Sequence, residues 1–145
     1  MLFRKECGFE SRLRHQMTKT TNTLIFDGDC GFCTSTANYL VKHSRQIITA
    51  LPHQFTDVTE YGLLQPQAEA RVWLVTTDEF GHQERFGGSD AFAKILILQQ
   101  RPLLTAIGQL LLIPPFCALA GLGYRLVARY RHKLPGGTPA CKLPR

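Results

Sequence analysis

Residues 23–33 read TLIFDGDCGFC, an apolar run followed by an acidic, glycine-containing turn that leads into two cysteines. The apolar run predicts a β-strand, and the turn predicts a change from strand to helix. Cys30 would then stand where the helix begins, with Cys33 about one helical turn further along. The stretch therefore predicts two neighbouring thiols at the end of a strand.

The size and cysteine content of the chain indicate one globular domain. With 145 residues, 44% of them hydrophobic, it can bury a core without metal or disulfide cross-links. Five cysteines make an odd number, which argues against the disulfide framework of a small secreted protein. We expect a single domain over residues 21–134, a disordered leader at 1–20 and an irregular tail at 135–145.

The N-terminal segment shows no recognisable secretory signal. Its first sixteen residues mix four basic residues with two acids and contain no continuous apolar core. The basic residues suggest a transit peptide as an alternative, but the acids and the missing apolar face argue against it. We therefore expect a cytoplasmic protein.

The net charge of +6 is distributed unevenly along the chain. Asp90 is the last acidic residue, so the segment after it carries +8 and the segment up to it carries −2. This asymmetry suggests an anionic partner such as a membrane surface or nucleic acid, although scattered basic residues usually serve solubility. We expect no nucleic acid partner, peripheral membrane contact stays open, and the oligomeric state is not predicted.

Hydrophobic periodicity predicts alternating strands and helices in most of the chain. The predicted elements are a helix from Cys33, a buried strand at 46–51, a short helix at 57–64 capped by Thr56 or Asp57, strands at 71–76 and 82–86, and a helix at 91–100. The early alternation predicts parallel pairing through helical crossovers, and the last two strands predict an antiparallel hairpin. The fold class is therefore α/β, a mixed sheet flanked by helices.

The C-terminal segment contains a long uncharged run at residues 102–124. Its length would allow a transmembrane helix. Pro114 and Pro115 stand in the middle, however, and paired prolines interrupt the hydrogen bonding of a helix. We therefore predict an additional C-terminal helical segment, made of two shorter helices at residues 103–113 and 116–131.

The cysteine pair suits thiol–disulfide exchange. Thiolate is the reactive form of cysteine, and a helix N-terminus lowers a thiol pKa, so we expect an exposed Cys30 to attack. Cys33, facing the core, would resolve the mixed disulfide by bonding to Cys30. Asp27 and Asp29 oppose thiolate formation by their charge. Asp27 is a candidate proton acceptor for the resolving thiol, and Asp29 is a candidate helix cap.

Two other chemistries at the same turn are weaker alternatives. A C-x-x-C pair is half of a zinc site, but the other cysteines and histidines form no compact second pair, so no metal is expected. The strand ending in Asp-Gly-Asp also resembles the first motif of haloacid dehalogenase-like phosphatases, with Asp27 as nucleophile and Asp29 as acid/base. Gly31 stands where that motif has Thr or Val, and no later Asp-Asp pair would hold magnesium.

The string DGDCGFC at residues 27–33 closely resembles the signature of the DCC family (DUF393, YuxK-like) of predicted thiol-disulfide oxidoreductases. The resemblance extends over most of residues 23–144 and includes the segments GSDAF at 88–92, IP at 113–114, YRLVAR at 124–129 and CKLP at 141–144. It implies a thioredoxin-like fold and protein-disulfide oxidoreductase activity at Cys30 and Cys33. Protein thiols or disulfides and a dithiol electron donor would be the partners, without a cofactor.

Two features qualify this resemblance. Better-known thioredoxin relatives have a cis-proline directly before the third strand, where this chain has Glu69 and Ala70, so peptides would dock differently. Cys141 is a candidate third thiol, although a free tail cysteine is the plainer interpretation. The alternative function is a non-catalytic redox-sensing module that binds a membrane surface or a protein through its basic, apolar C-terminal half.

Overall fold

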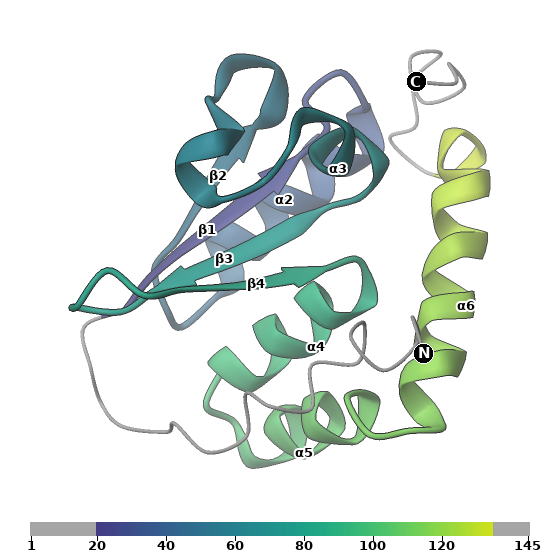
Figure 1. Cartoon of the computed structure of the whole chain (residues 1–145). Helices are drawn as coiled ribbons and strands as arrows, with labels where there is room; N and C mark the ends of the chain where they lie inside the picture. The colour runs from purple at the N-terminus through teal and green to yellow at the C-terminus, as the bar shows by residue number, and fades with distance from the viewer. Residues whose placement is uncertain (1–19, 135–145) are drawn as a thin grey trace.

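The computed structural model describes residues 20–134 (Figure 1). Nearly all of the predicted leader and the whole predicted tail, including Cys141, lie outside the described residues. The described elements are β1 (Thr21–Phe26), α2 (Gly31–His43), β2 (Ile48–Pro52), η2 (His53–Phe55), η3 (Val58–Tyr61), α3 (Gln65–Ala70), β3 (Trp73–Thr77), β4 (Gln83–Gly87), α4 (Ser89–Leu98), α5 (Pro102–Leu111), α6 (Phe116–Tyr130) and η4 (Arg131–Lys133).

The sheet is mixed, with the strand order β2-β1-β3-β4 (Figure 1). β1 pairs in parallel with β2 through the crossover helix α2, while β3 runs antiparallel to both β1 and β4. The predicted parallel pairing is confirmed for β1 and β2 but is wrong for β3, which follows a helix and yet runs antiparallel to β1. The predicted hairpin of β3 and β4 and the covering helices are confirmed. This arrangement is α/β and consistent with a thioredoxin-like fold, with the predicted C-terminal helices in addition.

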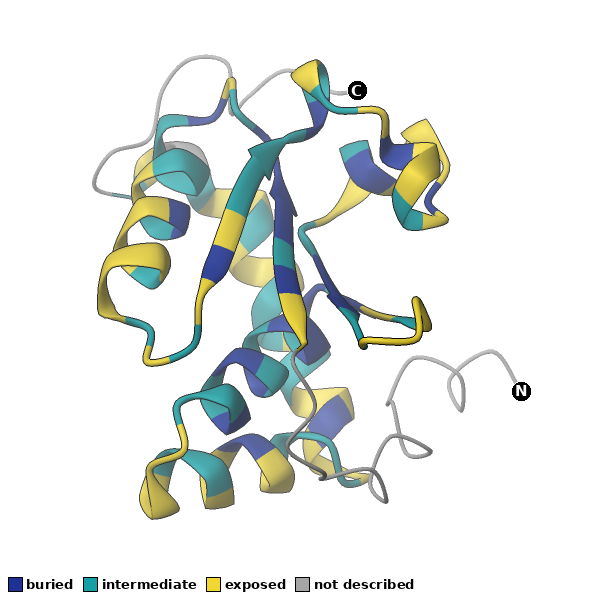
Figure 2. Cartoon of the chain, turned by 90° about the vertical axis from the view of Figure 1, so that its left-hand side faces the viewer, coloured by how far each residue is buried: buried dark blue, intermediate teal, exposed yellow. Residues whose placement is uncertain are grey.

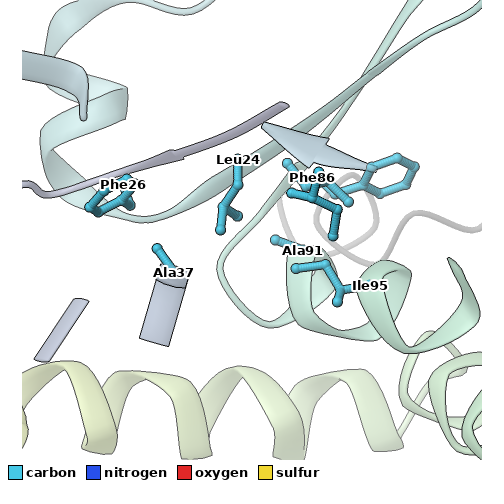
Figure 3. Close-up of a cluster of buried hydrophobic side chains, with 8 residues drawn as sticks. Leu24, Phe26, Ala37, Phe86, Ala91 and Ile95 are labelled. Atoms are coloured by element: carbon cyan, nitrogen blue, oxygen red, sulfur yellow. The ribbon is translucent and has the colours of Figure 1, made fainter. Parts of the chain in front are cut away.

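The core on one face of the sheet joins β1 to the helices α2 and α4 (Figure 3). Side chains of a strand alternate between the two faces, so Leu24 and Phe26 share this face. They pack in one cluster with Ala37 of α2 and with Ala91 and Ile95 of α4. Burial of these apolar side chains fixes α2 beneath the strand that ends at the cysteine turn.

The opposite face of the sheet is covered by shorter segments. Ile25 of β1 and Val75 of β3 are fully buried there against Val58, Leu63 and Ala68, which come from η3, the following turn and α3. Figure 2 shows buried positions along the strands and exposed positions along the outer sides of the helices. The sheet is therefore sandwiched between unequal helical layers.

The C-terminal helices α5 and α6 are separate, as predicted, and meet at an angle of 91° across the break at the two prolines (Figure 1). Within residues 20–134, no single helix has both the length and the apolar character needed to cross a membrane. α5 packs tightly on α4 at Gly108. A Cβ added to this glycine would lie only 2.6 Å from the carbonyl oxygen of Ala93. Glycine thus permits close contact between these two helices.

Some predicted elements differ from the structure. β2 was expected to be buried, but as an edge strand it buries only Ile48. The helix expected at residues 57–64 is a shorter 3₁₀ turn, Val58–Tyr61, although Asp57 caps it as predicted by accepting a hydrogen bond from the Thr59 N–H. α4 begins at Ser89, two residues before its predicted start. The short helix α3 was not predicted.

Candidate thiol-disulfide site

The cysteine turn connects β1 to α2 as the sequence predicts. α2 begins at Gly31, and Cys30 is the N-cap residue, with extended backbone angles. The Cys30 N–H donates to the carbonyl oxygen of Asp27 at 3.3 Å, and the Thr34 N–H donates to the carbonyl oxygen of Cys30 at 2.9 Å. Cys30 thus stands at the positive end of the helix dipole, a position that favours a thiolate.

The turn packs against the end of β2. A Cβ added to Gly28 would lie 2.7 Å from the Pro52 Cβ, so a larger residue does not fit there. The Gly28 N–H donates to Oε1 of Gln54 at 3.0 Å. This close approach holds the turn, and with it the helix start, against the sheet edge.

The two cysteines differ in exposure in the opposite sense from the prediction. Cys30 is fully buried, at 0% exposure, whereas Cys33 is only partly buried. The prediction that Cys30 is the more exposed sulfur is wrong, because the apolar stripe of a helix does not reveal what covers its first residue. Cys30 is disulfide-bonded and Cys33 is a free thiol, so the two are not bonded to each other in this structure.

Cys33 is contacted by a cation from the C-terminal segment. Nη1 of Arg131 donates to the Cys33 Sγ at 3.5 Å. Burial raises the pKa of the Cys33 thiol, while the charge and hydrogen bond of Arg131 act to lower it and the charge of Asp27 acts to raise it. Burial dominates, so Cys33 is held as a neutral thiol whose ionisation depends on Arg131.

Asp27 is the centre of a buried polar network at the end of β1. Its Oδ1 accepts hydrogen bonds from Nε2 of Gln54 at 2.7 Å and from the Asp29 N–H at 3.1 Å. Its Oδ2 lies 3.6 Å from Nη2 of Arg131. The same guanidinium therefore contacts both Asp27 and the Cys33 sulfur, which joins a carboxylate, a cation and a thiol in one chain of contacts.

A buried histidine extends this network away from the cysteines. Nε2 of His53 lies 3.9 Å from Oδ1 of Asp27, and its Nδ1 is 3.3 Å from Nε2 of Gln65. His53 is only 3% exposed. Asp27 therefore has a buried imidazole as a neighbour in addition to the guanidinium of Arg131.

Asp29 does not occupy the position that the sequence predicted for it. It is exposed and precedes the N-cap, because Cys30 rather than Asp29 occupies the cap position of α2. The expected cap is thus one residue further along. The carboxylate of Asp27 contacts the guanidinium beside Cys33.

An apolar cavity of about 410 Å³ lies beside Cys33. Its walls come from β1, α2, α4 and α6, and they include Phe26, Phe32, Cys33, Phe92, Tyr124 and Arg131. The volume falls within the range of small-molecule sites. The free thiol and its cation are therefore placed at the wall of an apolar chamber that α6 helps to enclose.

The residue before β3 is held by a side chain of α6. The Val72 N–H donates to the hydroxyl oxygen of Tyr124 at 3.1 Å. Burial raises the pKa of the Tyr124 hydroxyl. This contact occupies the backbone donor of the residue before β3, next to the cavity.

Three site residues were not singled out from the sequence: Arg131, Gln54 and His53. Arg131 was noted only as part of a basic helix end, yet its guanidinium reaches Cys33 across a sequence separation of 98 residues. The available signal was its spacing of seven residues from Tyr124, which places both on the same side of a helix. Among residues 20–134, no group of three metal-ligating side chains could hold a metal ion.

The sequence model of the DCC1-like thiol-disulfide oxidoreductase family matches residues 24–137, well over half of the chain. The chain belongs to this family. Comparisons with curated proteins and with solved structures gave no match. The matched region of this DCC1-like protein spans the cysteine turn and all of α6, so both sides of the site described above fall within it.

Proposed function

We propose that this DCC1-like protein exchanges disulfides with protein substrates through Cys30 and Cys33. The observation that carries the proposal is the placement of Cys30 at the N-cap of α2 with the free thiol of Cys33 on the next turn, in contact with Arg131. A helix N-terminus and a nearby cation are the two surroundings that favour thiolates. Family membership supports thiol–disulfide chemistry in general.

In the proposed reaction, the Cys30 thiolate attacks a substrate disulfide. One substrate sulfur becomes bonded to Cys30 and the other leaves as a thiolate. Cys33 then loses its proton and attacks the Cys30 sulfur, which releases the second substrate thiolate and forms the Cys30–Cys33 disulfide. A dithiol donor, in the cytoplasm that we expect as the location, would reduce this disulfide and complete the cycle.

The proposed roles of the two cysteines rest on the position of Cys30 at the helix start and on the burial of the Cys33 thiol. The helix start favours ionisation of Cys30, whereas burial raises the pKa of Cys33. Cys33 is the free thiol in this structure, and the proposal gives it the resolving step. Arg131 would stabilise the Cys33 thiolate as it forms, and Asp27 would receive its proton.

Trapping of substrates tests the assignment. Cys33→Ser should accumulate mixed disulfides, since nothing resolves the bond formed at Cys30, whereas Cys30→Ser should not. The measurement is affinity capture of each variant, elution with dithiothreitol and mass spectrometry of the released proteins, with the double variant as the background control. Equal trapping by the two single variants would contradict the assigned roles.

Turnover separates this enzyme from a redox sensor. With a dithiol supplied in excess, the protein should reduce many equivalents of a model protein disulfide such as insulin. A sensor would react once per molecule and stop. A single turnover would favour the non-catalytic alternative.

A further inference from the structure

The outer surface formed by α5 and α6 is apolar. Nine large apolar side chains on these helices are each between 39% and 71% exposed, namely Leu103, Ile107, Leu110, Phe116, Leu119, Leu122, Leu126, Val127 and Tyr130. We call these nine residues the α5–α6 face. α5 runs along the bottom of Figure 1 and α6 rises along its right side, so the face covers one corner of the molecule. Exposed patches of this kind mark interaction sites.

The α5–α6 face is a helical stripe and not a scatter of positions. On α6 it follows residues 119, 122, 126 and 130, a spacing that lines one side of a helix. The other side of α6 lines the cavity through Ala120, Tyr124 and Ala128. A surface helix of a globular protein usually has a polar outer side. α6 instead carries an exposed apolar stripe beside Arg125 and Arg129, so this stripe is suited to contact with something apolar.

The charges around the α5–α6 face select the occupant. Arg101, Arg125 and Arg129 are exposed on or beside these helices, and no acidic residue follows Asp90. A second copy of the chain would bring the same basic helices against these ones, and like charges repel across such an interface. An anionic lipid surface instead supplies both an apolar layer and negative charge.

We propose that the α5–α6 face binds an anionic lipid membrane peripherally. The helices lie in the plane of the lipid headgroups and do not cross the bilayer. The 91° bend between them and the close packing of α5 on α4 leave only their outer sides for insertion. The arginines beside the face attract the headgroups, while the apolar side chains enter the boundary with the acyl chains.

Vesicle flotation with the full chain tests this proposal. The protein should float with vesicles of phosphatidylcholine containing phosphatidylglycerol, and not with phosphatidylcholine alone. Replacing both Arg125 and Arg129 by glutamine should weaken binding about 25-fold, since each basic residue near an anionic surface contributes about fivefold. Leu119→Glu should weaken it about tenfold or more, because an inserted leucine becomes a charge.

A matched control is Phe80→Glu, which makes the same kind of change at an exposed aromatic side chain in the β3–β4 turn. It should leave binding unchanged. Absence of flotation, or equal flotation with neutral and anionic vesicles, would overturn the proposal. So would light scattering that shows an oligomer without vesicles which Leu119→Glu dissociates, because the face would then be an interface between copies. Disulfide exchange by Leu119→Glu should persist, which separates this test from that of the proposed function.

Discussion

Substitution of Arg131 by glutamine should shift the ionisation of Cys33 to higher pH. Nη1 of Arg131 is 3.5 Å from the Cys33 Sγ, and an opposite charge within about 4–6 Å lowers a pKa by about 1–3 units. The guanidinium is 22% exposed and also pairs with Asp27, both of which weaken its effect on the sulfur. We therefore expect the lower end of such effects, a further rise in the pKa of Cys33 that slows the reactions of its thiolate about tenfold.

The assay is alkylation of the reduced protein by iodoacetamide, with the rate at Cys33 followed by peptide mass spectrometry. Only the thiolate reacts, so the rate should rise about tenfold per pH unit below the pKa and level off above it. Burial already places this levelling-off above the ordinary thiol range. Arg131→Gln should move the levelling-off of the rate to higher pH. At any pH below the levelling-off, alkylation of this variant should be about tenfold slower.

Arg129→Gln is the matched control, because Arg129 is an exposed arginine on the same helix. It should leave the profile unchanged, and Arg131→Lys should restore most of it by keeping a positive charge. A variant that only opened access to the sulfur would raise the plateau rate without moving the midpoint. An unshifted midpoint in Arg131→Gln, or an equal shift in Arg129→Gln, would refute the reasoning.

Two further predictions concern stability. Gly108→Ala should destabilise the fold by about 1–3 kcal/mol through the clash with Ala93, whereas Gly123→Ala, where nothing lies within 4 Å, should stabilise α6 by about 0.5–1 kcal/mol. Shifts of equal sign in denaturant unfolding would contradict this. Tyr124→Phe should cost about 1 kcal/mol by leaving the Val72 N–H unpaired, and it should remove the tyrosine that ionises at raised pH from an alkaline absorbance titration.

The parts of the fold that sequence predicted are those with strong local patterns. β1 and β3 are runs of β-branched and apolar residues, and the C-x-x-C turn opens α2 as expected. The short helix α3 has only six residues, too few to show a helical period, and it begins with Gln65 and Pro66. Its helical form follows from burial of Ala68 beneath the sheet, a contact that no local pattern reveals.

The candidate site divides in the same way. Cys30, Cys33 and Asp27 were predicted because they lie within one short stretch. Gln54 and Arg131 reach Asp27 from segments that are distant in sequence, and nothing about either residue alone indicates a site. The relative exposure of the cysteines was predicted wrongly for a related reason, since periodicity describes one helix and exposure depends on its neighbours.

The arginines near the end of α6 lie on different sides of the helix and have different surroundings. Successive residues are turned by about 100°, so Arg131, seven residues after Tyr124, returns to nearly the same side of the helix. Both line the cavity. Arg129 lies two residues before Arg131 and is turned by about 200° to the outer side, where it is exposed like Arg125. A composition-based interpretation treats the three arginines as one basic patch. Their angular positions separate them. Arg131 lines the cavity and contacts the Cys33 thiol, whereas Arg125 and Arg129 are exposed on the surface.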